Sequence, residues 1–362
     1  MSAHEVLIYI MAAFAVLGAL DRIFGNRIGI GKEFEEGILA MGSLALAMLG
    51  IIALAPVLAN LLRPVVVPVY QFLGADPAMF AGTILACDMG GAPLAAELTT
   101  DPEAAALGGI LCGSMLGATI VFTIPVAIGI LRKEDTGALA KGVLAGIVAI
   151  PLGILAGGLV AGIPLLKILR NLLPVAVMAA VIALGLWKAE KWMVKGFGLF
   201  GKAIIALITI GLAAAIVEEL TGFTIIPGLA PLSDGFETVG AIAIVLAGAF
   251  PLVWTVTKLL RKPLLRVGKW LGINDTAAGG LIATLANSIA TFGMVKDMDQ
   301  RGKVVNIAFA VSAAFVFGDH LGFTAGYSPE MLPAMIVGKL TGGISAILVA
   351  LLLTRKPTQN EP

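Results

Sequence analysis

Long apolar stretches follow one another along almost the whole chain, separated by short polar segments. A helix needs about 20 mainly apolar residues to cross the hydrocarbon core of a bilayer. Nine stretches have roughly this length: 5–24, 37–62, 104–131, 138–162, 171–188, 203–220, 237–257, 303–325 and 331–353. We expect each of them to form a transmembrane helix. The pattern therefore predicts an all-α polytopic membrane protein.

Two further apolar segments, 76–98 and 274–295, are interrupted by Gly, Pro, Asp or Asn. They are either full spans, which gives eleven in all, or re-entrant hairpins beside nine spans. Lys and Arg concentrate on cytoplasmic loops, so the basic residues can decide between the two interpretations. With nine spans, 20 of the Lys and Arg residues outside the spans lie on one face and 3 on the other. With eleven spans, the same residues divide into 13 and 10. The charges favour nine spans and two re-entrant hairpins, with the N-terminus outside and the C-terminus cytoplasmic.

The two halves of the chain share short sequence similarities at an offset of 198 to 202 residues. Each match is weak, but they occur in the same order. Three of the matched pairs are Arg63-Pro64 with Lys262-Pro263, Leu73-Gly74-Ala75-Asp76 with Leu271-Gly272-Ile273-Asn274, and Ala81-Gly82 with Gly279-Gly280. Because five spans separate the starts of the two halves, we expect the second copy to be inverted in the membrane.

This organisation divides the chain into a first membrane repeat, 1–165, a linker helix, 166–198, and an inverted second repeat, 199–356. A cytoplasmic tail, 357–362, follows. Inverted repeats with interrupted helices place irregular backbone around a substrate near the middle of the bilayer. The predicted fold is therefore that of an inverted-repeat transporter.

Composition supports a membrane protein and excludes several other classes. Hydrophobic residues make up 59% of the chain and charged residues only 13%, compared with about 25% charged residues in soluble domains. The formal net charge of +1 gives no support for nucleic-acid binding. We expect Cys87 and Cys112 to be buried thiols rather than a disulfide. No sequence pattern indicates a cofactor or a metal cluster.

Asp88 is the first candidate for a functional side chain, because it lies inside the interrupted segment 76–98. A carboxylate at membrane depth costs about 2.5–3.5 kcal/mol on insertion scales and is by default a functional candidate. The alternative role is a helix N-cap. The second interrupted segment offers the neutral residues Thr284, Asn287 and Ser288, which would either bind substrate or form ordinary helix–helix hydrogen bonds.

Asp319 and His320 interrupt the apolar stretch 303–325. They could bind a cation, relay a proton, or form a satisfied buried contact. Glu35, Glu36 and Glu97 are accessory candidates; charge compensation at a helix start also explains the first two. Lys339 lies within the last span, and the sequence does not identify its partner.

The chain resembles the ethanolamine-utilisation permease family, EutH. The segments that carry the resemblance are Phe34-Glu35-Glu36-Gly37 with residues 41–48, residues 79–91 around Cys87-Asp88-Met89-Gly90-Gly91, residues 283–287, and Arg301–Asn306 through Gly318–Phe323. The similarity covers nearly the whole chain, with Ser288 standing where the family would have a second Asn. The resemblance implies uptake of ethanolamine across the cytoplasmic membrane of a bacterium.

Our hypothesis is a transporter for protonated ethanolamine, in which Asp88 pairs with the ammonium and Asn287 and Ser288 serve the hydroxyl. Asp319 and His320 would support the cavity or sense pH. The sequence leaves open a facilitator or an ion-coupled carrier, another small amine or an amino acid as substrate, and a homo-oligomer. An intramembrane aspartyl protease is disfavoured because Val316 stands where its Gly-x-Gly-Asp pattern requires Gly. The expected partners are ethanolamine and the lipid bilayer; a non-transporting scaffold would leave the buried carboxylates unexplained.

Overall fold

The computed structural model describes residues 2–354, apart from the side chains of residues 190, 260–262 and 264. The predicted cytoplasmic tail 357–362 lies outside the described residues. Within residues 2–354 the secondary structure is entirely helical. The α-helices are α1 (Ala3–Ile23), α2 (Ile30–Phe72), α3 (Ala78–Ile84), α4 (Gly91–Leu98), α5 (Pro102–Ala105), α6 (Ile124–Ile130), α7 (Thr136–Val160), α8 (Leu165–Thr221), α9 (Leu232–Leu271), α10 (Asp275–Ala286), α11 (Ser288–Met294), α12 (Gln300–Ala313), α13 (Asp319–Tyr327) and α14 (Leu332–Leu353).

Shorter or wider helical segments join these helices. Four are single turns of 3₁₀-helix: η1 (Cys87–Met89), η4 (Lys133–Asp135), η5 (Val295–Asp297) and η6 (Pro329–Met331). Two are π-helical, η2 (Ala106–Gly117) and η3 (Thr119–Thr123). Stretches of π-helix are rare and are found mostly at functional sites.

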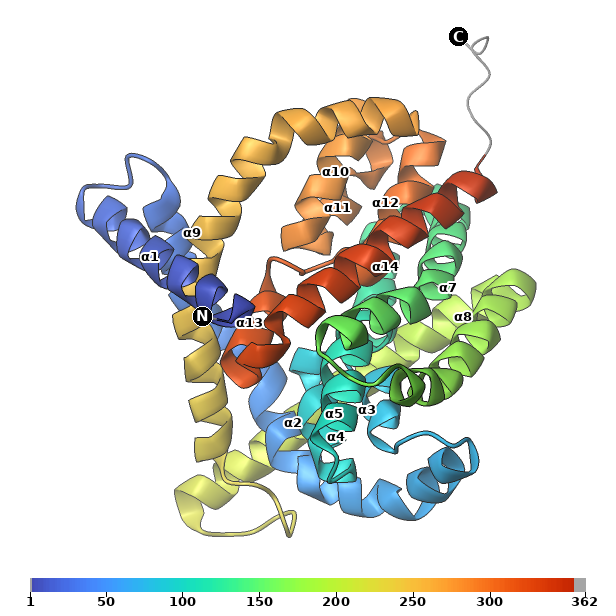
Figure 1. Cartoon of the computed structure of the whole chain (residues 1–362). Helices are drawn as coiled ribbons and strands as arrows, with labels where there is room; N and C mark the ends of the chain where they lie inside the picture. Colours follow the sequence, from blue (N-terminus) through green and yellow to red (C-terminus); the bar gives the residue numbers. More distant parts are fainter. Residues whose placement is uncertain (1, 355–362) are drawn as a thin grey trace.

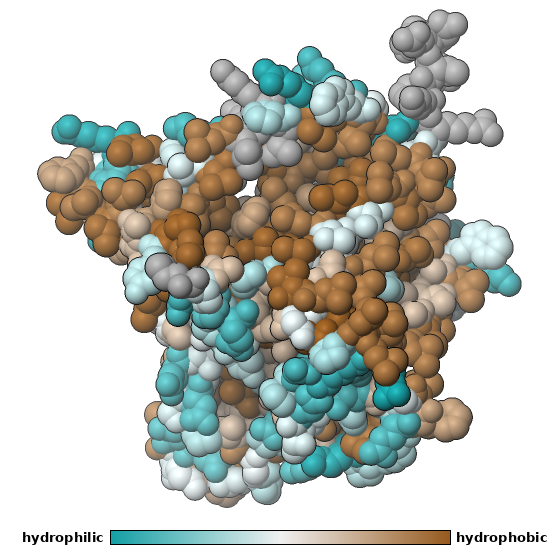
Figure 2. All heavy atoms as spheres, in the orientation of Figure 1, coloured by the Kyte–Doolittle hydropathy of each residue, from teal (hydrophilic) through white to brown (hydrophobic). Residues whose placement is uncertain are grey.

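Eight helical stretches of the described chain are long and apolar enough to cross a membrane: Ala3–Ile23, Ile30–Phe72, Pro102–Ile130, Lys133–Val160, Leu165–Ala189, Lys191–Thr221, Leu232–Leu259 and Pro329–Leu353. They correspond to eight of the nine predicted spans. Figure 2 shows apolar side chains over much of the middle and upper part of one face, with hydrophilic ones gathered along its lower and upper margins. The prediction of an all-α polytopic membrane protein is confirmed.

Two of these spans belong to the single long helix α8. Ala189 departs from helical geometry there, with φ −140° and ψ 42°, so the chain kinks between the two spans. The kink lies within the predicted linker helix 166–198. Helix α2 is longer than the predicted span 37–62 at both ends, and Pro56, Pro64 and Pro68 lie inside it. Proline is a common cause of helix bending, and the last turns of α2 curve along the lower edge of Figure 1.

The long helices surround two pairs of short ones. In Figure 1, α9 forms an arch along one side and over the top, while α14 crosses the front and packs against α7 and α12. Helix α3 packs against α4, and α10 packs against α11. The α10–α11 pair lies beneath the top of the arch, and α3 and α4 lie in the lower half of the picture, above the end of α2. These pairs occupy the predicted interrupted segments 76–98 and 274–295.

The predicted span 303–325 is divided in the structure into α12 and α13. Residues 314–318 between them are not helical, and Phe315 has a positive φ of 62°. Neither helix is long enough to cross a bilayer alone, because α12 has 14 residues and α13 has 9. The structure therefore has a third interruption, which follows from contacts made by residues 315–318 with α10.

Candidate functional site

The break between α3 and α4 presents Asp88. Helix α3 ends at Ile84, and α4 begins at Gly91 after the single turn η1. Gly90 allows this reversal because its φ is 94°, and an added Cβ there would lie 2.0 Å from Ile51 of α2. Only glycine adopts this conformation readily and leaves room for the neighbouring helix. The turn leaves the Asp88 side chain 15% exposed.

The break between α12 and α13 presents Asp319 and His320 in a related way. The last carbonyls of a helix have no partner within it. Here Thr284 O and Leu285 O, in the last turn of α10, accept hydrogen bonds from Phe315 N at 3.2 Å and Phe317 N at 2.9 Å. The chain then passes so close to α10 that a Cβ on Gly318 would lie 2.2 Å from Ala286 O. Helix α13 consequently begins at Asp319.

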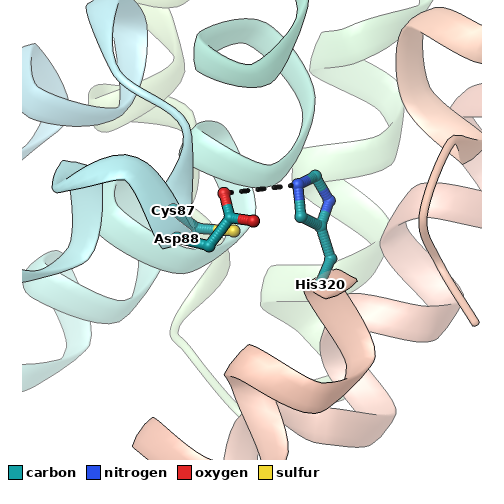
Figure 3. Close-up of side chains that lie close together, drawn as sticks. All are labelled: Cys87, Asp88 and His320. Atoms are coloured by element: carbon teal, nitrogen blue, oxygen red, sulfur yellow. Dashed lines mark ion pairs between the residues drawn. The ribbon is translucent and has the colours of Figure 1, made fainter. Parts of the chain in front are cut away.

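The two breaks meet at a cavity of about 1020 Å³, here called the Asp88 cavity. His320 Nε2 lies 3.7 Å from Asp88 Oδ1, and Figure 3 shows the ring and the carboxylate facing one another. The polar residues of the lining are Ser43, Asp88, Lys191, Lys195, Lys202, Asp319 and His320. Phe122 and Phe315 also line it, with ring centroids 5.4 Å apart. A carboxylate beside aromatic faces suits a small organic cation.

Lys339, His320 and Asp88 lie in a row, and nothing in the sequence indicated that Lys339 belongs to it. Its side chain is 1% exposed, and its ammonium donates hydrogen bonds to Ser114 O and to His320 Nδ1, the latter at 3.0 Å. An ammonium has no acceptor, so Nδ1 accepts and the proton of the neutral imidazole lies on Nε2, facing Asp88. The position of Lys339 in an apolar span marked it as unusual in the sequence. Its partners could not be identified there, because they lie 19 and 225 residues away along the chain.

A second cavity, of about 730 Å³, is here called the Asn287 cavity. Its lining includes Glu33, Trp254, Lys258, Asn287 and Asp319. Asp319 thus lines both cavities, whereas Asp88 lines only the first and Asn287 only the second. Of these lining residues, Glu33, Lys258 and the lysines at the first cavity were not among the predicted site residues.

The structure places Asn287, Thr284 and Ser288, the predicted residues of the second interrupted segment, in different surroundings. Asn287 caps α11 by accepting a hydrogen bond from Ile289 N at 2.8 Å. Thr284 is fully buried, and its hydroxyl lies 2.8 Å from that of Thr291. Ser288 is also fully buried, and its hydroxyl has no hydrogen-bond partner in the described chain. Thr284 and Ser288 line neither cavity.

The accessory candidates lie away from both cavities. Glu35 forms an ion pair with Arg22 at 3.2 Å between largely exposed side chains. Glu36 and Glu97 are exposed. None of the three lines the Asp88 cavity or the Asn287 cavity.

Cys87, Asp88 and His320 bring three ligand atoms within 4.8 Å of one another. This donor set does not fit a metal ion in the observed arrangement. The hydrogen bond from Lys339 makes Nδ1 the acceptor, so Nε2 carries a proton where a metal would need its lone pair. The adjacent ammonium would also repel a cation. Cys87 and Cys112 are free and buried, as expected.

The comparisons with known proteins agree over nearly the full length. Residues 3–353 match the family model described as "Ethanolamine utilisation protein, EutH". The chain is 58% identical over 356 residues to "Probable ethanolamine permease EutH" of Listeria monocytogenes, covering 98% of this chain and 95% of the relative. It is 50% identical to the protein of the same description from Salmonella typhimurium, covering 98% of this chain and 97% of the relative. It is also 50% identical to "Uncharacterized protein YxeR" of Bacillus subtilis, covering 98% of this chain and 96% of the relative.

No solved structure matches the chain. The family model and these relatives each span almost all of it, including the segments that carry Asp88, Asp319, His320 and Lys339. The chain therefore belongs to the EutH family of ethanolamine utilisation proteins.

Proposed function

We propose that the protein takes up ethanolamine, in its protonated form, across the cytoplasmic membrane of a bacterium. The observation that carries the proposal is the Asp88 carboxylate, which faces a cavity at a break between two short helices. The printed names of the Listeria and Salmonella relatives, as probable ethanolamine permeases, point to the same substrate. Asp88 pairs with the ammonium, and the aromatic rings of Phe122 and Phe315 line the space beside it.

The hydroxyl of the substrate is assigned to Asn287 and Ser288. These residues and Asp88 do not line a common cavity in this structure. The assignment therefore requires the two cavities to join at Asp319, which lines both, and requires Ser288, which is fully buried and lines neither, to become accessible. We propose that movement of the segment 314–318 relative to α10 joins them; this movement would break the two backbone hydrogen bonds from Phe315 N and Phe317 N to α10.

Re-entrant hairpins are supported by contacts that join the two ends of each interrupted segment. Thr99 Oγ1 donates to Asp76 Oδ2 at 2.9 Å, and so connects the end of α4 to the start of α3. Asn274 donates through Nδ2 to Asp297 O at 3.0 Å and through its backbone N to Asp299 Oδ1 at 2.9 Å. The two ends of each segment lie close together, which supports a re-entrant hairpin rather than a full span.

The inverted repeat is supported by local structure at matching positions. Gly74 and Gly272, which are 198 residues apart, have φ values of 70° and 67°. Each follows the end of a long helix, and the next residue donates to the carbonyl five residues before it, Tyr70 and Gly268 respectively. The first pair of short helices lies in the lower half of Figure 1 and the second in the upper half. We therefore propose repeats 1–165 and 199–356 in opposite orientations.

The membrane potential is sufficient to drive uptake of a monocation. An inside-negative potential supplies about 2.3 kcal/mol per charge per 100 mV, which is roughly fifty-fold accumulation. A facilitator and an ion-coupled carrier both remain compatible with this energy. Transport of another small amine or of an amino acid is the alternative within the same class.

Uptake of labelled ethanolamine by proteoliposomes under an imposed potential tests the proposal. Asp88→Asn keeps the side-chain size and removes the charge, so uptake should fall at least a hundred-fold while the protein stays folded and inserted. Asp234→Asn, an exposed carboxylate outside both cavities, is the matched control and should retain uptake. Wild-type uptake by Asp88→Asn would reject the site. Glycine or ethylamine outcompeting ethanolamine would reject the substrate, and chemical conversion of ethanolamine would favour an enzyme.

A further inference from the structure

We propose that Lys339 is a tethered cation that takes the place of a coupling ion, so that the cavity accepts one further positive charge and uptake needs no sodium. This inference rests on the proposed function, because it concerns how the same site sets the charge that is transported. It assigns a role to a residue that lines neither cavity but touches His320, which does.

Lys339 is buried inside the protein, and a charged side chain there needs partners that stabilise the charge. Lysines near helix ends can extend their ammonium to the membrane surface, but Lys339 is 1% exposed and lies in the interior of α14. An ionisable residue at such a depth is costly and normally has a partner. Lys339 finds its partners in a backbone carbonyl, Ser114 O, and in an imidazole nitrogen. Carbonyl oxygens of irregular helices are the groups that coordinate coupling cations in transporters with broken helices.

Ser114 belongs to the π-helical segment η2. The ammonium of Lys339 donates to the carbonyl of this residue from within the chain. A free cation would have to displace it.

The three lysines in the lining of the Asp88 cavity, Lys191, Lys195 and Lys202, are exposed, so solvent and salt screen their charges. Among the lining groups that are not exposed, Asp88, Asp319 and the neutral His320 are ionisable, and Lys339 lies directly behind His320. These four groups form the inner part of the site and set its formal charge. With both carboxylates ionised and Lys339 protonated, the sum is −1. Charges in a medium of low dielectric constant are most stable when they balance. One monocation, such as protonated ethanolamine, balances the cavity.

Two substitutions vary this sum independently. Lys339→Met keeps an unbranched side chain and removes the charge, so the cavity has a formal charge of −2 and should accept two monocations. Lys339→Met combined with Asp319→Asn restores −1. Asp319→Asn alone gives 0, which should weaken binding of any monocation. The series separates the effect of charge from the effect of altered packing.

The experiment measures charge per ethanolamine in proteoliposomes, from the potential at which net uptake reverses, in sodium and in potassium media. Wild type should move one charge at the same rate in both media. Lys339→Met should move two charges per ethanolamine, and a threefold or greater stimulation by sodium, or by lowered pH, identifies the second cation. The double variant should return to one charge.

Sodium dependence of the wild type would overturn the inference, as would one charge per ethanolamine in a folded Lys339→Met. If that variant does not fold, Lys339→Arg, which keeps the charge, should remain sodium-independent, and the sodium test on the wild type still decides. Complete absence of ethanolamine uptake by the wild type would instead reject the proposed function, so the two failures can be told apart.

Discussion

The ammonium of Lys339 lies 3.0 Å from Nδ1 of His320, and Nε2 of the same ring lies 3.7 Å from Asp88. The imidazole therefore separates a buried cation from the carboxylate that faces the Asp88 cavity. Its orientation is fixed by packing as well, because the ring of Phe315 lies 5.4 Å from it. His320 thus accepts a hydrogen bond from Lys339 on one side, and on the other its Nε2 faces Asp88 at a distance too long for a direct hydrogen bond.

Replacing His320 should distinguish its acceptor role from its bulk. Asn places an amide oxygen where Nδ1 lies, so His320→Asn keeps an acceptor for Lys339. His320→Leu removes it and leaves the ammonium with Ser114 O alone. Leaving a buried donor without its acceptor costs about 1–3 kcal/mol, so we expect His320→Leu to lower the melting temperature in detergent more than His320→Asn.

Lys339→Met in the His320→Leu background provides the control for this comparison. Without the ammonium, the loss of the acceptor should cost little, so the double variant should recover most of the stability. Equal melting temperatures for His320→Leu and His320→Asn would show that Lys339 does not depend on the imidazole.

Gly318 sets the close approach of residues 314–318 to α10. A Cβ at this position would lie 2.2 Å from Ala286 O, a backbone atom that no side-chain rotation can move. Gly318→Ala should therefore push the segment away from α10, break the hydrogen bonds to Thr284 O and Leu285 O, and cost about 1–3 kcal/mol as an overpacked site. Thermal unfolding in detergent and ethanolamine uptake should both be impaired.

Gly240→Ala is the matched control, since an added Cβ on Gly240 of α9 meets nothing within 4 Å. Alanine is favoured over glycine inside a helix by about 1 kcal/mol, so this variant should be at least as stable as the wild type. A stable, active Gly318→Ala would contradict the close contact with α10.

The sequence predicted those parts of the fold that depend on local composition and missed those that depend on contacts between distant residues. Span length and apolar composition are local properties, so eight helices of membrane length were identified at their approximate positions. The interrupted segments were visible as Gly, Pro, Asp and Asn within apolar sequence. The break at 314–318 was not, because residues 311–317 read as an uninterrupted apolar helix. Its geometry arises from hydrogen bonds to α10, about 30 residues away in the chain.

The candidate site was predictable in part for the same reason. Asp88, Asp319 and His320 were each conspicuous as polar residues at membrane depth, and the structure brings them to one cavity. The partner of Lys339 was not predictable, because Ser114 contributes only a backbone carbonyl, and any residue type has one. The division of Asp88 and Asn287 between two cavities likewise depends on packing that no local pattern contains.

Asp101 provides a pH-dependent contact outside the spans. Burial alone would raise the pKa of this carboxyl, but the hydrogen bond from Lys167 and those from the backbone of Ala104 and Glu103 lower it below its ordinary value of 3.8. A carboxyl with a lowered pKa in the folded state stabilises the protein above its unfolded pKa, and this contribution is lost as the pH falls through the folded value. The loss should therefore occur below about pH 4.

Asp101→Asn should remove that pH dependence and keep the cap. Asn is as good an N-cap as Asp, so the hydrogen bonds that Asp101 accepts from Glu103 N and Ala104 N are retained. The ion pair is more than one-third exposed on the Asp101 side, so its contribution at neutral pH should be below about 1 kcal/mol. Melting curves in detergent should show a smaller difference between the two proteins at pH 3 than at pH 7. A difference of the same size at pH 3 and pH 7 would show that the charge is not responsible.

The interpretations with nine and with eleven spans differ in the face of the membrane from which the two ends of each interrupted segment can be reached. In the re-entrant interpretation, positions 71 and 100 at the two ends of the first interrupted segment lie on the outer face, and positions 275 and 296 at the ends of the second lie on the cytoplasmic face. Gln71, Thr100, Asp275 and Lys296 are all exposed, so each can be replaced by Cys. Cys87 and Cys112 are buried and would be replaced by Ala to give a background without thiols.

A membrane-impermeant maleimide added to intact cells should label Gln71→Cys and Thr100→Cys and leave Asp275→Cys and Lys296→Cys unlabelled. Inverted vesicles should give the opposite result, and the Cys-free background, which must retain ethanolamine uptake, gives the blank. The decisive comparison is within each pair, because hairpin ends joined by Thr99–Asp76 and Asn274–Asp297 must react from the same face. Labelling of the two members of one pair from opposite faces would mean that the segment crosses the membrane completely, and the symmetry around Asp88 would then be lost.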